Sequence, residues 1–178
     1  MVDASDDGVV VRRVRPEEWE AYRTLRLKAL ASDRVAFGSS LEEESRRSDA
    51  EWKETTDHGA NSTRSYLSVA EVPGLELVGM TVGALVEETP WIFGMWVEPT
   101  WRGRGIGGAL LDSAIAWLQQ LRPSQPIFLD VNPRQAAALR LYGSRGFRPT
   151  GRSKRLDHSP GESAIQMCTQ PTTEHANA

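Results

Sequence analysis

The stretch of sequence that decides the fold is WVEPTWRGRGIGGALL, residues 96–111. A β-branched and aromatic segment, 91–97, leads into a glycine-rich turn, and a segment of helical apolar periodicity follows it. The turn and the start of the helix hold four glycines: Gly103, Gly105, Gly107 and Gly108. Without side chains, their N–H groups can approach a ligand closely, and the start of a helix offers unpaired donors and a positive dipole end. The turn therefore predicts a cradle for a phosphate-like anion, with a ligand-free tight turn as the alternative.

The segments after the turn place the two strands beside it. Residues 106–121 trace one apolar face of a helix, and residues 127–131 form a short apolar strand. Because a strand–helix–strand crossover joins parallel strands, we expect 91–97 and 127–131 to be parallel neighbours. The next helix is expected to begin at the dipeptide 132–133, Asn-Pro, and to end at Arg145.

The rest of the chain reads as one α/β domain of the α+β type. Helices are expected from Pro16 to Leu30, from Ser40, and over residues 49–56, and further strands are expected at 9–14, 65–72, 75–86, 151–156 and 163–169. The connections within 65–97 are too short for crossovers, so these strands are predicted to be an antiparallel meander. The result is a mixed, mostly antiparallel sheet of about six to seven strands flanked by about four helices. It spans residues 9–169, with flexible tails at 1–8 and 170–178.

Composition excludes several classes of protein. The 178 residues carry a formal net charge of −3, which argues against a dedicated nucleic-acid binder. The single cysteine allows neither an intrachain disulfide nor a cysteine-based zinc site. No apolar run approaches the ~20 residues that span a bilayer, and the acidic N-terminal residues do not resemble a signal peptide. We therefore expect a cytoplasmic protein without a membrane partner.

A dinucleotide-binding site is the main alternative for the glycine turn. Gly103-x-Gly105-x-x-Gly108 matches the dinucleotide fingerprint, and Asp130 lies near the end of the next strand, where a ribose-binding acid would fall. However, residues 98–102 separate the strand from the first glycine, and the chain has too few strand–helix units for that fold. No Gly-Lys-Ser/Thr follows the turn, which excludes a Walker A loop.

Two motifs in order carry a family resemblance. The first is Arg102-x-x-Gly105-x-Gly107, and the second is Ala138-x-x-Leu141-Tyr142-x-x-x-Gly146-Phe147. With weaker similarity in RLKAL (26–30) and AFGSSLEEE (36–44), the chain resembles the GNAT superfamily of N-acetyltransferases.

The resemblance implies that acetyl-CoA is the cofactor, bound as a co-substrate where the parallel strands 91–97 and 127–131 separate. The pyrophosphate would bind the loop amides, and the pantetheine arm would lie along the strand before them. Gln135 stands where the family often has asparagine, so its contact with the cofactor is left open. The implied cofactor-binding residues are Met95, Trp96, Val97, Arg102, Gly103, Arg104, Gly105, Ile106, Gly107, Gly108, Gln135 and Tyr142. No metal is implied.

The resemblance also suggests catalytic residues. Tyr142 would donate a proton or hydrogen bond to the departing CoA sulfur, although a tyrosine on an amphipathic helix is also a common core residue. Asp130, twelve positions earlier, is the first candidate base for the amine, and Glu98 is the second, on the other side of the gap. The alternatives are a strand-end acid in a salt bridge for Asp130 and a solvated turn acid for Glu98.

The expected activity is acetyl transfer from acetyl-CoA to a primary amine of a small molecule or a protein, by direct attack in a ternary complex. A non-catalytic acyl-CoA sensor is the alternative. Phe37 and Trp52 are candidates for the acceptor wall, with packing in the core as the alternative. The acids 42–44 are read first as a solvated helix face, and near an entrance they could attract cationic amines. The family resemblance also allows a homodimer. The identity of the acceptor does not follow from these patterns.

Overall fold

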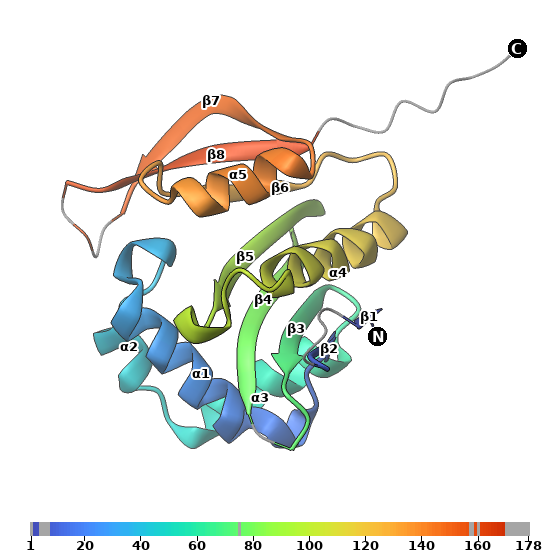
Figure 1. Ribbon diagram of the computed structural model, residues 1–178, viewed down its shortest axis with the longest axis vertical. Coiled ribbons are helices and arrows are strands. Elements are labelled where there is room, and N and C mark those ends of the chain that lie inside the picture. The colour runs from blue at the N-terminus through green and yellow to red at the C-terminus, as the bar shows by residue number, and fades with distance from the viewer. Residues whose placement is uncertain (1, 4–7, 75, 157–158, 160, 170–178) are drawn as a thin grey trace, which may run out of the picture.

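The computed structural model describes residues 2–3, 8–74, 76–156, 159 and 161–169 (Figure 1). Their strands are β1 (Val2–Asp3), β2 (Val10–Arg13), β3 (Ser65–Glu71), β4 (Leu77–Val86), β5 (Thr89–Val97), β6 (Phe128–Val131), β7 (Phe147–Arg155) and β8 (Ser163–Thr169). Their α-helices are α1 (Trp19–Ser32), α2 (Leu41–Ser45), α3 (Asp49–Asn61), α4 (Ile106–Leu121) and α5 (Ala136–Ser144). Short 3-10 turns occupy Pro16–Glu18, Arg34–Ala36 and Pro99–Trp101. The predicted α/β class is confirmed.

The strands form one mixed sheet in the order β1-β2-β3-β4-β5-β6-β8-β7. The β3–β4–β5 meander and the closing β7–β8 hairpin are antiparallel, as predicted. The predicted parallel pair joins β5 to β6 through only two residue pairs, Trp91 with Phe128 and Ile92 with Leu129. Beyond these pairs β5 and β6 separate, as Figure 1 shows between the green and orange strands. The sheet therefore has a gap near its middle.

Helices cover both faces of the sheet. On one face, α1 and α3 pack against β3 and β4, and Trp52 is fully buried in this core. On the other face, α4 packs against β2 to β5, and its apolar residues also join the core around β6 and α5. Gly79 of β4 lets α4 come close, since a Cβ there would lie 2.9 Å from Leu110 Cδ1. Thus α4 bridges the strands on either side of the gap.

The expected start of the last helix was wrong. Instead of capping a helix with Pro133 in its first turn, Asn132 accepts a hydrogen bond from the Arg134 N–H at Oδ1, 2.9 Å, and its amide donates to Glu162. This side-chain turn competes with helix formation, so α5 begins at Ala136 with Gln135 as its N-cap.

Other boundaries also differ from the expectation. We expected a flexible tail at 1–8, and within it Val2–Asp3 pair with β2. The helix expected over 49–56 continues to Asn61, because its capping box is followed by a buried face that includes Thr56 and Gly59. Leu75 and the expected tail at 170–178 lie outside the described residues.

Candidate active site

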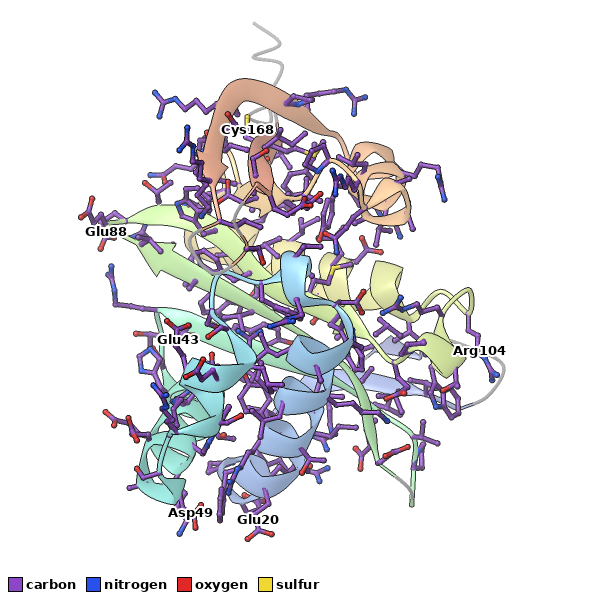
Figure 2. The ribbon with its side chains drawn as sticks, turned by 90° about the vertical axis from the view of Figure 1, so that its left-hand side faces the viewer. Glu20, Glu43, Asp49, Glu88, Arg104 and Cys168 are labelled. Atoms are coloured by element: carbon purple, nitrogen blue, oxygen red, sulfur yellow. The ribbon has the colours of Figure 1, made fainter. Side chains whose placement is uncertain are left out.

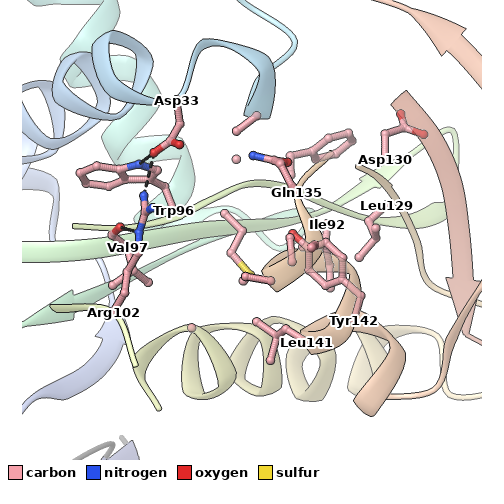
Figure 3. Close-up of a pocket in the computed structure, with 18 of the residues that line it drawn as sticks. Asp33, Ile92, Trp96, Val97, Arg102, Leu129, Asp130, Gln135, Leu141 and Tyr142 are labelled. Carbon is pink, nitrogen blue, oxygen red and sulfur yellow. Dashed lines mark hydrogen bonds and ion pairs between the residues drawn. The ribbon is translucent and has the colours of Figure 1, made fainter. Parts of the chain in front are cut away.

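The gap between β5 and β6 opens into a cavity of about 430 Å³ (Figure 3). Backbone of β5, the loop before α4, the end of β6 and the start of α5 form its walls. Most of the predicted cofactor-binding positions meet here: Met95, Trp96, Val97, Arg102, Gly103, Gly107, Gln135 and Tyr142 all line this cavity. Arg104, Gly105, Ile106 and Gly108 belong to the same loop and helix start but not to its lining.

A β-bulge in β5 forms the edge of the gap. Met80 of β4 pairs with Trp96 and Val82 pairs with Phe93, so Gly94 and Met95 together face one residue. Gly94 has a φ of 60°, a conformation that glycine adopts without strain. Such a bulge bends the strand and ends regular pairing. The sequence analysis missed this feature, although a glycine inside a predicted strand is a known bulge signal.

The loop before α4 has the geometry of an anion cradle. Gly103 and Gly105 both have a φ of 80°, and Gly105 is the N-cap of α4. No side chain caps this helix, and its first turn has no acidic residue. The N–H groups of the first helical turn are therefore left for an external acceptor, which the positive end of the helix dipole favours as an anion.

The two loop arginines do not extend freely toward this cradle. Arg102 folds back, and its Nε donates to the Val97 carbonyl at 2.8 Å while Nη2 donates to Asp33 Oδ2 at 2.7 Å (Figure 3). Arg104 lies at the outer edge of the molecule, its guanidinium 4.7 Å from the centre of the Trp101 ring (Figure 2). Arg102 therefore joins the loop to β5 and to Asp33 through these hydrogen bonds.

Asp33 accepts hydrogen bonds from both Arg102 and Trp96, and sequence reasoning missed it. Its Oδ2 accepts the 2.6 Å hydrogen bond from Trp96 Nε1. Burial alone would raise the pKa of Asp33, but the hydrogen bonds from Trp96 and Arg102 outweigh it and hold the pKa below its ordinary value. The ionised carboxylate thus ties the end of α1 to β5 and to the glycine loop.

Tyr142 projects from α5 into the cavity near Ile92 and Leu141 (Figure 3). Its ring packs against Phe147, and the side chain is buried. Burial raises the pKa of the phenol to about 12. Among the described residues the hydroxyl has no hydrogen-bond partner, so it is a protonated donor aimed at a ligand.

Asp130 lies on β6 at the opening of the gap. Leu129 and Val131 are buried in the core, and Asp130 points to the other face of the sheet. Its Oδ2 is 2.6 Å from Lys154 Nζ of β7, and none of the described residues donates to Oδ1. A carboxylate oxygen is therefore available to a cationic or protic ligand.

Glu98 does not join this site. We expected it to be a second base on the other side of the gap. Its Oε2 instead lies 2.5 Å from Lys28 Nζ, in a separate depression between α1 and the start of β4. The turn after β5 points this side chain toward α1, so the structure argues against Glu98 as a base.

A second cavity, of about 400 Å³, meets the first from the α1–α2 side. The two share five lining residues: Ala36, Ile92, Phe93, Gly94 and Asp130. Phe37 lines this second cavity, as expected for an acceptor wall, whereas Trp52 is not among its lining residues. We call the first the cofactor-side cavity and the second the acceptor-side cavity, and Gly94 and Asp130 lie where they join.

Replacing Gly103 with alanine is expected to destabilise the loop without a steric clash. A Cβ at Gly103 meets nothing within 4 Å, so the cost is backbone strain at positive φ, roughly 1–2 kcal/mol. We expect the unfolding midpoint to fall by roughly 2–8 °C and the stabilisation by added CoA to shrink. Gly143→Ala is the matched control, because Gly143 lies inside α5 with open space around it and should gain about 0.5–1 kcal/mol. Equal midpoints for the two variants would contradict the strained-loop interpretation.

No described helix is long and apolar enough to cross a membrane. Within the described ranges, no cluster of three or more histidine, cysteine, aspartate or glutamate side chains is arranged to hold a metal ion.

Comparisons with known proteins place these features in a family. The profile of the acetyltransferase (GNAT) family matches residues 16–147. A curated relative, the [ribosomal protein bS18]-alanine N-acetyltransferase of Escherichia coli K12, is 29% identical over 96 residues, which are 54% of this chain and 64% of the relative. The chain thus matches less than two thirds of that relative's length.

Solved structures share the fold. YncA from Salmonella typhimurium, solved with its cofactor acetyl-CoA, superposes with a TM-score of 0.74 at 16% identity, covering 91% of this chain and 93% of that one. The ribosomal-protein-S18-alanine N-acetyltransferase of Escherichia coli has a TM-score of 0.67 at 18% identity, covering 96% and 98% of the two chains.

Proposed function

The chain belongs to the acetyltransferase (GNAT) family, and from that premise we propose that it transfers the acetyl group of acetyl-CoA directly to a primary amine in a ternary complex. The observation that carries the proposal is the meeting of two cavities at Gly94 and Asp130. One cavity has the anion cradle and Tyr142, and the other opens toward α1 and α2. A thioester and an amine can therefore approach one point from opposite faces of the sheet.

The residues of the cofactor-side cavity fit acetyl-CoA. The N–H groups at Gly103, Gly105 and the first turn of α4 would hold the pyrophosphate. The edge of β5 from Met95 to Val97, which β6 leaves unpaired, would pair with the amides of the pantetheine arm as a strand does. Bound acetyl-CoA supplies an activated acyl thioester, and the chain's own residues position it and handle the protons.

Two side chains on the β6 and α5 side of the gap suit the proton transfers. Asp130 would take a proton from the ammonium of the acceptor, directly or through water, so that the amine can attack. A backbone N–H of β5 beside the bulge would polarise the thioester carbonyl. As the carbon–nitrogen bond forms and the carbon–sulfur bond breaks, Tyr142 would donate its proton to the sulfur, and the second proton lost by the nitrogen would return to the Tyr142 phenolate, directly or through water.

The acceptor is a primary amine of a small molecule or of a protein. The curated relatives named above act, by their names, on the alanine of a ribosomal protein, which makes a protein N-terminus one candidate. The match spans only 64% of that relative, so its substrate is not transferred as a whole.

Thermal unfolding in the presence of acetyl-CoA, CoA, NADH and ATP tests the cofactor. A ligand at about 100 times its dissociation constant adds roughly 2.7 kcal/mol, which corresponds to a rise of roughly 5–10 °C for a chain of this size. We expect acetyl-CoA and CoA to raise the midpoint and NADH to leave it unchanged. A rise with NADH alone would overturn the proposal in favour of a dinucleotide site. If acetyl-CoA raises the unfolding midpoint but no tested amine causes release of the CoA thiol, the result supports the alternative of a non-catalytic acyl-CoA sensor.

A further inference from the structure

Arg26 is a charged side chain beside the reaction point that the mechanism above does not use. It projects from α1 into the wall of the acceptor-side cavity, and its side chain is only 13% exposed. Its guanidinium lies over the ring of Phe37, 4.4 Å from the ring centre. A Cβ built on Gly94 would be 3.4 Å from Arg26 Nη1, so the charged end reaches the bulge in β5. Arg26 thus lies next to the place where the two cavities meet.

The hydrogen bonds of Arg26 are incomplete. Nη2 donates to Ser39 Oγ at 2.9 Å and lies 3.4 Å from Glu44 Oε1. Among the described residues, Nε and Nη1 have no acceptor. These donors face the cavity and are available to a ligand that enters it. Its planar fork matches a carboxylate, which can accept two parallel hydrogen bonds.

The charges around the acceptor-side cavity also leave room for an anion. Its described lining holds three cations, Arg26, Arg47 and Lys154, and two anions, Glu44 and Asp130. Glu44 bridges the two arginines, with Oε2 at 3.0 Å from Arg47 Nη1. Burial alone would raise the pKa of Glu44, but hydrogen bonds from Arg47 and Ser39 hold it below its ordinary value. Among the side chains of this lining, the cations therefore exceed the anions by one.

This arrangement changes the expectation for the acids at 42–44. We expected that they could attract cationic amines to the opening. Glu44 is instead shared between Arg26 and Arg47, and Glu42 pairs with Arg46 at 2.5 Å. Two of the three acids, Glu42 and Glu44, are therefore paired with arginines of the same region.

We propose that Arg26 binds a carboxylate of the acceptor, and that the acceptor is a free α-amino acid. This inference rests on the proposed acetyltransfer and names its substrate class. Arg26 Nη1 lies beside Gly94, and Gly94 and Asp130 both line the junction, so this arrangement suits an acceptor with a short spacer between its carboxylate and its amine. An α-amino acid has one carbon between them. A polyamine and the N-terminus of a peptide both lack a carboxylate at that distance.

The inference is tested by assaying the full chain with acetyl-CoA against sets of three related amines, here called triplets. Each triplet contains an L-α-amino acid, its carboxamide and its decarboxylated amine, taken across the protein amino acids. We expect kcat/KM for the best acid to exceed that for its carboxamide and amine by roughly 10- to 100-fold, the size of one hydrogen-bonded charge pair. A panel in which carboxamides or plain amines react as well as the acids, or in which no acid reacts, overturns the inference.

Variants separate recognition from a structural role. Arg26→Gln should raise KM for the acid and leave KM for the carboxamide unchanged, so that the ratio of the two kcat/KM values falls to about one. Arg23→Gln is the control, since Arg23 lies on the same helix and pairs with Asp49 at the surface. If Arg26 only braced α1 against α2, all three members of a triplet would lose activity equally.

Failure of the inference and failure of the proposed function give different results. Carboxamides or plain amines that react without any preference for the acid overturn only the role of Arg26. If no member of any triplet reacts and acetyl-CoA leaves the unfolding midpoint unchanged, the acetyltransfer itself is overturned. The comparison within each wild-type triplet needs no variant, so it holds even if Arg26→Gln fails to fold.

Discussion

Replacing Tyr142 with phenylalanine is expected to lower kcat by roughly 100- to 1,000-fold, with acetyl-CoA affinity unchanged. The departing sulfur would carry negative charge into a gap where the side chain of Tyr142 is mostly buried and its hydroxyl has no hydrogen-bond partner among the described residues. An unpartnered thiolate in such surroundings is strongly disfavoured. Phenylalanine keeps the packing against Phe147, so stability should change by less than about 0.5 kcal/mol.

The pH dependence and a matched variant test the role of the phenol. With a pKa of about 12, Tyr142 remains protonated up to pH 10, so we expect no fall in kcat from its ionisation below that pH. Tyr66→Phe is the control. The Tyr66 hydroxyl forms a 2.8 Å hydrogen bond with Ser113 Oγ, and Tyr66 lines neither cavity. If Tyr142→Phe retained full kcat, Tyr142 would be a core residue and water would protonate the sulfur.

Replacing Asp130 with asparagine is expected to lower kcat/KM by roughly 100-fold or more at neutral pH. Asparagine keeps the size of the side chain but cannot accept a proton from the ammonium. Raising the pH deprotonates the amine in solution, so the defect should shrink toward alkaline pH. Steady-state rates from pH 6 to pH 10 measure this recovery, and a defect independent of pH would assign Asp130 to positioning.

Glu98→Gln is the matched control for the Asp130 variant. It removes the same charge, but its carboxylate lies outside both cavities and pairs with Lys28. We expect activity within about two-fold of wild type, because the exchange loses only a salt bridge with a half-exposed lysine. A loss as large as that of Asp130→Asn would restore Glu98 as a base.

Most of the fold follows from local sequence patterns. Periodicity separates the helices from the strands, short connections fix the meander, and the crossover makes β5 and β6 parallel neighbours. The turn after Asn132 is made by a local hydrogen bond to the Arg134 N–H, but the bond from the Asn132 amide to Glu162, thirty positions away, has no local signal. In the site, too, local motifs predict single residues but not their partners on distant elements.

Within the site, the cradle and the position of Tyr142 were predictable because each depends on a contiguous motif. The partners of these residues were not. Asp33 meets Arg102 and Trp96 across more than sixty positions, and Lys154 meets Asp130 only because β7 and β8 fold back along β6. Arg26 resembles an ordinary helix-surface arginine until the bulge at Gly94 places it beside the junction. Pairings between distant elements leave no local signal.

The two residue pairs that join β5 to β6 also have a mechanical consequence. They divide the sheet into two blocks, β1 to β5 and β6 to β8, that share α4 as a common backing. Each block keeps its own ladders, so few backbone hydrogen bonds oppose a widening of the seam between them. A small rotation of one block against the other would widen this seam for a bulky co-substrate while both blocks stay folded.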